Sequence, residues 1–303
     1  MSTNFAAGVS FYPVSNLSAK NANLYIYDSI IASNTCATYA GGLYVNAANG
    51  PSPSAYLYNS AIIGNVATGY APGAALGVST ALVQNCTFTG NSTPGTTAAG
   101  ALYLVNIVGQ TAGLLVQTNW TVRNCTIAGN SAPAGPCGGF GYSHGVLSQA
   151  LFLVSTIIAQ NTATSIGGAP DIKQLNPNYT YPQCVESYNL IGDSTNCALV
   201  IAGSNIFSVA GQTLNANNSY IGNSGAAVGT VNPQLSTLAN NGGPTPTMAL
   251  QGGSLAIDHG ANPGNLLSDQ RGSGYNRVVG SQADIGAFEF GSGPPTGLII
   301  YIQ

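Results

Sequence analysis

The sequence has almost no charged side chains. Asp, Glu, Lys and Arg together make up 4% of its 303 residues, where a globular protein usually has ~25%. The net charge is −3, and no charged residue occurs between Ser29 and Val122. Binding to nucleic acid or insertion at an anionic membrane surface requires clustered Lys and Arg, so neither partner is expected.

Long apolar runs and helix-forming residues are also scarce. No segment approaches the ~20 apolar residues of a membrane-spanning helix, and residues 1–16 lack the basic start and apolar stretch of a secretory signal. Only two Lys and two Glu stand against 40 Gly, which disfavours helices. Six cysteines and so few charges indicate an extracellular location, with the signal removed or the sequence part of a longer chain.

An eight-residue pattern occurs five times and ends in asparagine each time. Its copies are YDSIIASN, YNSAIIGN, QNCTFTGN, RNCTIAGN and VSTIIAQN. The closing residues are Asn34, Asn65, Asn91, Asn130 and Asn161, and glycine follows each after a short polar stretch. Intervals of 31, 26, 39 and 31 residues between them indicate a solenoid, whose repeats bury their apolar faces only against their neighbours.

Within each copy the second position is polar, while the third and fifth carry small, β-branched or aromatic residues. This period of two predicts strands, and one strand-bearing coil per repeat predicts a parallel β-helix. The closing asparagines are expected at bends, in the left-handed backbone region, with their side chains hydrogen-bonded from coil to coil in a ladder. Tyr27 and Tyr58 share the odd, inward phase of the pattern, although the sequence does not fix their direction.

The six cysteines comprise two candidate pairs, Cys184 with Cys197 and Cys86 with Cys125, and two further residues, Cys36 and Cys137. The first pair flanks a short segment and is predicted to form a local disulfide. The second pair shares an inward position of neighbouring repeats, where coils ~4.8 Å apart allow either a disulfide or two stacked thiols. Cys36 and Cys137 lie three repeats apart, too far to bond within one chain, so they are free thiols or candidates for an intermolecular bond. No Cys or His spacing suggests a metal site.

A surface without charge can be covered by glycans or by copies of the same protein. Asn-x-Ser/Thr sequons identify as glycosylation candidates Asn16, Asn85, Asn119, Asn124, Asn178 and Asn217. The sequon at Asn91 is set aside because a ladder side chain should turn inward. A chain rich in Asn and Thr also produces sequons by chance, and this alternative stays open.

The octets fade after Ile172, and other motifs follow. They are NLIGD at 189–193, NNGGPT at 240–245, AIDHG at 256–260, DQRG at 269–272 and DIGAFE at 284–289. Together with the NCTFTGN and NCTIAGN octets, they resemble bacterial choice-of-anchor Q surface proteins, whose repeats are similar to those of polymorphic outer-membrane proteins, over roughly residues 27–290. The resemblance implies a secreted, right-handed parallel β-helix with a terminal cap and no known catalytic chemistry. Such proteins usually continue into an anchor, whereas this sequence closes with GSGPPTGLIIYIQ.

Six of the thirteen charged residues lie between positions 258 and 289. A solenoid's last coil exposes unpaired backbone that polar groups must block, and the residues expected to form this cap are Asp258, Asp269, Arg271, Asp284 and Glu289. The alternative is an acid/base or carbohydrate site of Asp258, His259, Asp269 and Arg271. The repeats offer only Arg123 and His144, without the paired carboxylates of glycosidases or the base and calcium site of lyases. No catalytic residue, cofactor or metal is therefore expected.

The sequence as a whole predicts an all-β fold, a right-handed parallel β-helix of about ten coils. The domain is expected to span residues 1–290, in three parts: an N-terminal segment (1–23), the repeats (24–172), and C-terminal coils with their cap (173–290). A Gly/Pro hinge and a β-prone tail form residues 291–303.

The expected function is that of an extracellular, non-enzymatic structural protein that assembles with itself into a filament or surface layer. The head-to-tail connector is the tail strand of Leu298, Ile299, Ile300, Tyr301 and Ile302, which can pair with an open sheet edge of the next subunit. One alternative is a monomeric adhesin or carbohydrate-binding surface domain, with sugar rings stacked on Tyr25, Tyr27, Tyr56 and Tyr58. A second is a polysaccharide lyase or hydrolase.

Overall fold

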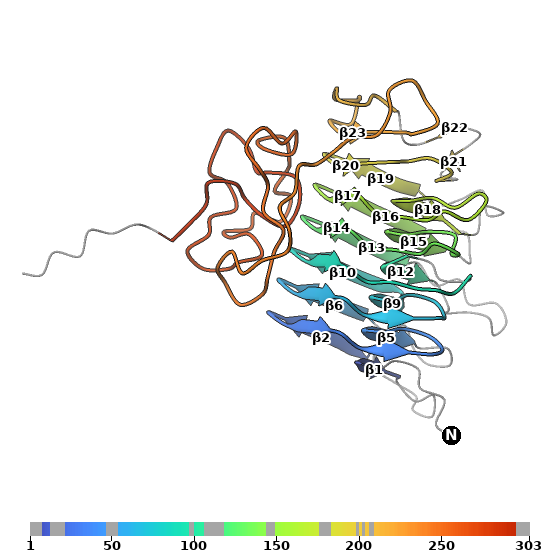
Figure 1. The fold of residues 1–303 in the computed structure, drawn as a ribbon. Helices are drawn as coiled ribbons and strands as arrows, with labels where there is room; N and C mark the ends of the chain where they lie inside the picture. The colour runs from blue at the N-terminus through green and yellow to red at the C-terminus, as the bar shows by residue number, and fades with distance from the viewer. Residues whose placement is uncertain are drawn as a thin grey trace, which may run out of the picture.

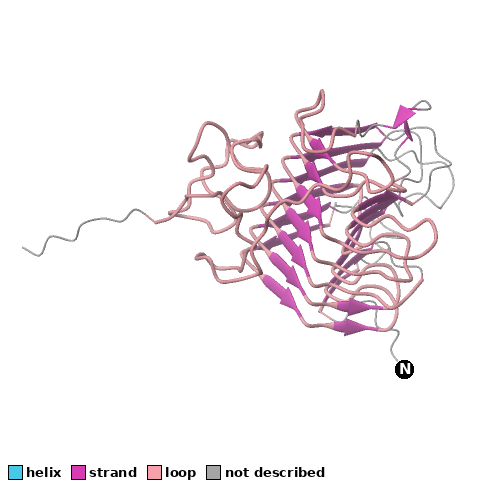
Figure 2. Cartoon of the chain, turned by 45° about the horizontal axis from the view of Figure 1, so that its top comes forward, coloured by secondary structure: helices cyan, strands magenta, loops and turns pink. Residues whose placement is uncertain are grey.

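Three parallel β-sheets wrap around one apolar interior (Figures 1 and 2). The computed structural model describes residues 8–12, 22–46, 54–96, 100–105, 118–143, 149–175, 183–197, 200–201, 204–205 and 209–294. The first sheet consists of β2 (Asn23–Tyr27), β6 (Ser54–Tyr58), β10 (Thr80–Gln84), β13 (Thr118–Arg123), β16 (Gln149–Val154) and β19 (Gln183–Ser187). The second consists of β3 (Ile30–Ala32), β7 (Ala61–Ile63), β11 (Thr87–Thr89), β14 (Thr126–Ala128), β17 (Ile157–Ala159), β20 (Leu190–Ile191) and β23 (Tyr220–Ile221). The third consists of β1 (Val9–Phe11), β5 (Leu43–Asn46), β9 (Ala74–Gly77), β12 (Leu102–Val105), β15 (Phe140–Ser143) and β18 (Ile172–Gln174).

The chain visits the three sheets in turn, and equivalent strands of successive coils pair in parallel. This topology confirms the predicted parallel β-helix. The sheets have six, six and seven strands, which gives six to seven coils and not the predicted ten. Two small pairs complete the strands: β4 (Thr35–Cys36) with β8 (Val66–Ala67), and β21 (Val200–Ile201) with β22 (Ser204–Asn205). None of the described residues forms a helix with the length and hydrophobicity needed to cross a membrane.

Residues at the same position of successive octets stack in rows through the interior. The fifth position forms one such row, which is Ile31, Ile62, Phe88, Ile127 and Ile158. All five are buried, and they belong to a core cluster that runs the length of the β-helix. Burial of one such side chain contributes about 1.5–3 kcal/mol, so each coil is stabilised mainly by the coils above and below it.

The bends between strands lie at the second and seventh positions of the octet. The second residue joins the first sheet to the second, and its φ lies between 45° and 52° in Asp28, Asn59, Asn85, Asn124 and Ser155. At the seventh position Ser33, Gly64, Gly90, Gly129 and Gln160 have φ between 57° and 68°. Asn, Asp and Gly tolerate this left-handed region best. The expectation that the closing asparagines occupy the left-handed region was therefore wrong.

The five closing asparagines instead form a hydrogen-bonded ladder along the axis. The backbone N and Nδ2 of Asn34 donate to Asn65 Oδ1 at 3.1 and 2.9 Å. The same pair of bonds joins each later member to the next, from Asn65 to Asn91, Asn130 and Asn161. Each Nδ2 after the first also donates to a backbone carbonyl of the preceding coil, as Asn65 does to Ile31 O at 2.9 Å. The buried amides are thus satisfied by identical neighbours.

The recurring glycines make room for this ladder. A Cβ atom at Gly42 would lie 2.5 Å from Gly73 O and 3.0 Å from Asn65 Nδ2. A Cβ atom at Gly139 would lie 2.4 Å from Asp171 O and 2.7 Å from Asn161 Nδ2. A side chain at Gly42 or Gly139 would therefore meet the ladder and the next backbone, whereas two other coils hold Ala101 and Asp171 at the equivalent position.

After β23 the described residues, up to 294, add no further coil and turn back along the flank of the β-helix (Figure 1). We call residues 232–294 the side module. It lies against the bend between the first and second sheets, and its hydrogen bonds reach four coils: Thr245 Oγ1 to Asn59 O, Asn85 Nδ2 to Ser268 O, Asn124 Nδ2 to Ala261 O, and Gly286 N to Ser155 O. Its apolar residues, among them Leu250, Ile285 and Phe288, cover outward side chains of the second sheet such as Ile157 and Leu190.

Candidate functional site

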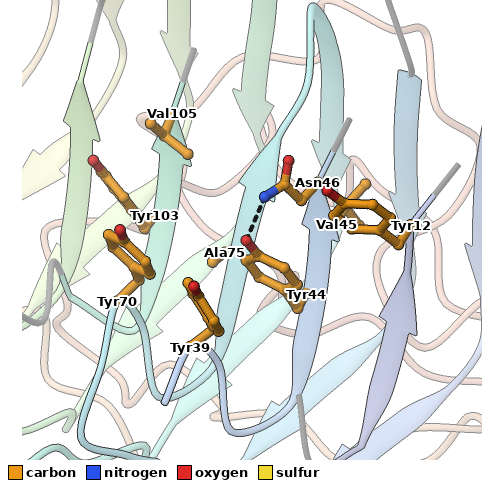
Figure 3. Close-up of a pocket in the computed structure, with 9 residues that line it drawn as sticks. All are labelled: Tyr12, Tyr39, Tyr44, Val45, Asn46, Tyr70, Ala75, Tyr103 and Val105. Atoms are coloured by element: carbon orange, nitrogen blue, oxygen red, sulfur yellow. Dashed lines mark hydrogen bonds between the residues drawn. The ribbon is translucent and has the colours of Figure 1, made fainter. Parts of the chain in front are cut away.

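A groove rich in tyrosine lies on the outer face of the third sheet (Figure 3). Its cavity has a volume of about 320 Å³, within the range of ligand sites in proteins. The lining residues are Tyr12, Tyr39, Tyr44, Val45, Asn46, Tyr70, Ala75, Tyr103 and Val105. They come from four successive coils, because Tyr12 follows β1 and the others belong to or precede β5, β9 and β12. We call this the tyrosine groove.

The hollow follows from the alternation and register of the strands. In β5, Leu43 faces the core, so the next residue, Tyr44, lies on the outer face. Tyr44 pairs with Ala75 of β9, and Ala75 pairs with Tyr103 of β12. Two large side chains thus flank a small one on the same row, and the missing volume at Ala75 opens the groove between them.

Two further tyrosines form the rim. Tyr39 and Tyr70 hold the same position in successive coils, since Tyr70 N donates to Tyr39 O at 2.8 Å. Their rings stack with centroids 5.3 Å apart and an angle of 18° between the planes. Tyr70 in turn stacks on Tyr103 at 6.3 Å and 15°, and Tyr39 contacts Tyr44 at 5.1 Å. Figure 3 shows the hydroxyls of Tyr39, Tyr70 and Tyr103 on the same side of their rings.

The groove is polar but uncharged. None of its described lining residues is Asp, Glu, Lys, Arg or His. Asn46 Nδ2 donates to the Tyr44 hydroxyl at 2.5 Å, and burial raises the pKa of Tyr44 to about 12. Burial also raises the pKa of Tyr103. The hydroxyls of Tyr44 and Tyr103 therefore stay protonated at neutral pH and can act as both hydrogen-bond donors and acceptors.

A second cavity, of about 350 Å³, lies where the asparagine ladder ends. Asp171 replaces a sixth asparagine there: its Oδ1 accepts from Asn161 N and Nδ2 at 3.0 and 2.9 Å, and its Oδ2 accepts from Asp193 N at 2.6 Å. Burial raises the pKa of Asp171 to about 7, although these hydrogen bonds lower it in part. Burial alone would raise the pKa of Asp193, but hydrogen bonds from Thr195 and Ser224 hold it below its usual value. These carboxylates serve the fold, and the described residues include no group of three or more His, Cys, Asp and Glu suited to a metal.

The residues expected to cap the last coil lie in the side module, not over that coil. Asp269 and Arg271 form a buried ion pair with N–O distance 2.6 Å, and the guanidinium lies 3.8 Å from the Phe288 ring centroid. Asp284 accepts from Asp258 N at 2.8 Å, and Glu289 accepts from Asp284 N at 2.9 Å. These carboxylates hold the turns of the side module together, as hydrogen bonds to backbone N–H groups do in any compact loop.

Arg123 and His259 lie in different parts of the fold, each hydrogen-bonded to its own neighbours. Arg123 Nε and Nη2 donate to Gln84 Oε1 at 2.8 and 2.6 Å on the outer face of the first sheet. His259 Nδ1 lies 2.7 Å from Ile257 O within the side module. His144 lies outside the described residues, as do the tail residues 298–302.

All six cysteines are buried, and the structure has no disulfide among them. The predicted disulfide between Cys184 and Cys197 is absent, and both residues belong to the core cluster. Cys86 and Cys125 stack at the inward position as two thiols, and they donate to Gln84 O at 3.2 Å and Val83 O at 3.4 Å. Cys36 and Cys137, predicted as free thiols or as candidates for an intermolecular bond, are 3% and 0% exposed, and this burial disfavours the intermolecular bond.

The sequons differ in their accessibility. Asn85 and Asn124 are buried beneath the side module, so the prediction of glycans at these two positions was wrong. Asn119 and Asn217 are exposed and remain candidates. Asn16 and Asn178 lie outside the described residues.

Tyr25 and Tyr27 on β2 point outward. They are 51% and 52% exposed, and they stack on Tyr56 and Tyr58 of the next coil with centroids 4.8 Å apart in both cases. The inward phase suggested for Tyr27 was wrong, because the left-handed residue Asp28 resets the alternation between one strand and the next.

No protein-family model, no curated protein and no solved structure matches this chain.

Proposed function

We propose that the protein is an extracellular, non-enzymatic β-helix that binds a neutral glycan in the tyrosine groove. The observation that carries this proposal is the uncharged cavity lined by five tyrosines and one asparagine from successive coils. Tyrosine presents an apolar ring and a polar hydroxyl at once, and a sugar ring presents the matching combination of C–H groups and hydroxyls. Such a groove suits saccharides better than an anionic or a purely apolar ligand.

The proposal excludes catalysis because the groove has no acid or base. The pKa of the Tyr44 hydroxyl, about 12, keeps it from acting as a base near neutral pH. The carboxylates of the side module are buried in contacts with backbone N–H groups and Arg271. Glycoside cleavage needs two carboxylates that face the substrate, so we propose binding alone.

The Tyr70→Ala variant tests the proposed site. Tyr70 is 46% exposed on the rim, so its removal leaves the core intact and takes away both a ring and a hydroxyl. We expect at least about a tenfold loss of affinity for whichever neutral glycan an array of immobilised saccharides identifies. The matched control is Tyr25→Ala, which removes an equally exposed tyrosine outside the groove and should bind as the unchanged protein does. Equal losses in both variants, or no binding of any neutral glycan, would contradict the proposal.

The location and the family are part of the same proposal. The scarcity of charge and the order of the C-terminal motifs support a secreted surface protein related to the choice-of-anchor Q type, with a right-handed coil. Glycans at Asn119 and Asn217, which are exposed sequons, fit this location.

A second candidate function is self-assembly, which the first coil favours. The rings of Tyr25 and Tyr27 have centroids 6.2 Å apart and planes that are parallel to within 4°, and Ile30 is 52% exposed. Tyr56 and Tyr58 of the next coil stack on one face of the Tyr25 and Tyr27 rings. A second copy of the chain that places its own rings on the opposite face would extend the stack, as the first step toward a filament or surface layer.

The double variant Tyr25→Ser/Tyr27→Ser tests self-assembly. We expect the unchanged protein to elute as a dimer or larger species in size-exclusion chromatography and the double variant to elute as a monomer, because the exposed aromatic pair is lost. Tyr70→Ala, which leaves the first coil untouched, serves as the control and should still assemble. A monomeric unchanged protein at high concentration would rule out this candidate.

A further inference from the structure

Two pairs of tyrosines on the outer face of the first sheet are stacked in register. Tyr25 of β2 is the strand partner of Tyr56 of β6, and Tyr27 is the partner of Tyr58. The ring centroids are 4.8 Å apart in both pairs, and the ring planes differ by 9° and 7°. This distance matches the ~4.8 Å spacing of paired strands. The two rings of a pair are therefore displaced mainly along the axis, and their equivalent atoms lie opposite each other.

These rings can be reached from solvent. Tyr25 and Tyr27 are 51% and 52% exposed, and their partners on β6 are half-buried. β2 lies at the edge of the first sheet, where the structure describes a single strand beside it, β6. By contrast, Tyr44 and Tyr103 on the outer face of the third sheet are buried. A small oxidant in solution can therefore reach the stacked pairs of the first two coils but not those two rings.

Other side chains that oxidants attack are buried in the part of the chain that the structure describes. All six cysteines are buried, as is Trp120, the single tryptophan of the sequence. Met248 is 8% exposed. Because the oxidation of cysteine and methionine follows their exposure, these groups compete poorly with tyrosines on the surface. A one-electron oxidant therefore meets the exposed phenols first.

We propose that Tyr25 with Tyr56 and Tyr27 with Tyr58 are sites of oxidative cross-linking, at which each pair becomes a dityrosine that ties the first coil to the second. The oxidant is hydrogen peroxide, used by a haem peroxidase that acts on the protein from outside. This modification is independent of the glycan site, because none of the four tyrosines lines the tyrosine groove. Its effect is to hold the edge strand β2 covalently to β6.

The reaction removes two hydrogen atoms from each pair. Each ring first loses the hydrogen of its hydroxyl to the peroxidase, which leaves a phenoxyl radical that shares its unpaired electron with the carbons ortho to the oxygen. The para carbon already holds the rest of the side chain, so the new bond joins one ortho carbon of each ring. The hydrogens on these two carbons then move to the two oxygens and restore both hydroxyls. Two phenols and one hydrogen peroxide thus give one dityrosine and two water molecules.

The register of the strands favours this coupling within one chain. Equivalent ortho carbons of a stacked pair start about one coil spacing apart, ~4.8 Å. Rotation of exposed side chains, which takes picoseconds to nanoseconds, can bring these carbons together without a change in the backbone. A radical on Tyr25 therefore meets its partner on β6 far more often than it meets another molecule at low protein concentration.

The test is treatment of the purified full chain, at low concentration, with hydrogen peroxide and a haem peroxidase. Dityrosine fluorescence measures the yield, and mass spectrometry of protease fragments identifies the joined residues. We expect a protein that stays monomeric on a denaturing gel. It should yield fragments that join Tyr25 to Tyr56 or Tyr27 to Tyr58, each two hydrogens lighter than the sum of its parts. Cross-links that join two chains, or none at these pairs, would overturn the proposal.

Tyrosine-to-phenylalanine variants keep every ring and remove only the reactive hydroxyl. Tyr25→Phe/Tyr27→Phe should lose most of the fluorescence. Tyr56→Phe/Tyr58→Phe should lose it to the same extent, although the two most exposed tyrosines are still present, because each then lacks its stacked partner. The matched control is Tyr70→Phe, which removes a hydroxyl of similar exposure in the tyrosine groove and should keep most of the fluorescence.

Full fluorescence in Tyr56→Phe/Tyr58→Phe would show that exposure alone decides which tyrosines react, and it would overturn the paired sites. An equal loss in Tyr70→Phe would do the same. Far-UV circular dichroism before oxidation checks that each variant retains the β-helix.

Discussion

Replacing Asn91 with leucine is expected to lower the free energy of unfolding by about 3–5 kcal/mol. Asn91 is buried in the middle of the ladder, where its Oδ1 accepts two hydrogen bonds from Asn65 and its Nδ2 donates to Ile62 O and Asn130 Oδ1. Leucine has a similar volume but none of these groups, so several buried partners would be left unsatisfied. The measurement is the urea midpoint, with an unchanged dependence on denaturant concentration.

The control lies at the first rung of the same ladder. Asn34 donates to Asn65, but no side chain of the ladder donates to it, and it is only partly buried. Asn34→Leu removes the same chemical group at the same position of the octet, and we expect a loss of only about 1 kcal/mol. Equal losses at the two positions would show that the ladder does not stabilise the fold through its buried bonds.

The second large effect is a loss of stability as the pH rises from about 4 to about 7. Burial raises the pKa of Asp171 from 3.8 to about 7 and that of Glu289 from 4.5 to about 7, and it raises the pKa of Asp284 as well. Between the unfolded and folded pKa values the folded chain holds protons that the unfolded chain has released, so the free energy of unfolding decreases with pH. Each raised pKa unit corresponds to roughly 1.4 kcal/mol.

Thermal unfolding at pH 5 and pH 8 measures this effect. We expect a clearly lower melting temperature at pH 8, because above the folded pKa the buried carboxylates are ionised. Asp171→Asn keeps an oxygen for Asn161 and carries no charge at any pH, so this variant should lose less stability between the two pH values than the unchanged protein. A melting temperature that rises from pH 5 to pH 8, or an unaltered pH dependence in Asp171→Asn, would contradict the assigned direction.

The repeat itself could be predicted from the sequence because every coil packs the same octet positions against its neighbours. The fifth octet position had to be apolar in each copy, and the structure stacks Ile62 on Phe88 and Phe88 on Ile127 as that period requires. The place of the bend could not be read from the closing asparagine, since Asn is suited both to a left-handed bend and to a buried ladder. The second and seventh positions, rich in Asn, Ser and Gly, carried the signal for the bend.

The C-terminal part could not be predicted in the same way because it does not repeat. Its charged motifs hold turns within the side module, and its contacts with the coils join residues far apart in sequence, such as Thr87 and Gln270. No periodicity indicates which flank of a solenoid such a segment covers. One residue gave an indirect indication of the covered flank. Ile157, at the fourth position of the fifth octet, is apolar and faces outward, so it must be buried by another segment, whereas Ile30 at the same position of the first octet is exposed.

Part of the tyrosine groove could have been predicted from the spacing of tyrosines in the sequence. Tyr39 and Tyr70 are 31 residues apart, the same interval as between Asn34 and Asn65, so they had to share one position of successive coils. Their recurrence in a polar stretch before glycine could have marked a surface row. The cavity itself depends on Ala75, whose place between two tyrosines follows from strand register that the sequence did not define.

The side module has a consequence for how this protein can change in evolution. In most solenoids each repeat touches only its neighbours, so repeats are gained or lost without harm to the rest. Here one segment is fastened to four coils at fixed positions, from Asn59 to Ser155. Deletion of a single coil would shift the later hydrogen-bonding positions on the β-helix by ~4.8 Å, so the side module could no longer reach all of them. The side module thus constrains the number of coils in the β-helix.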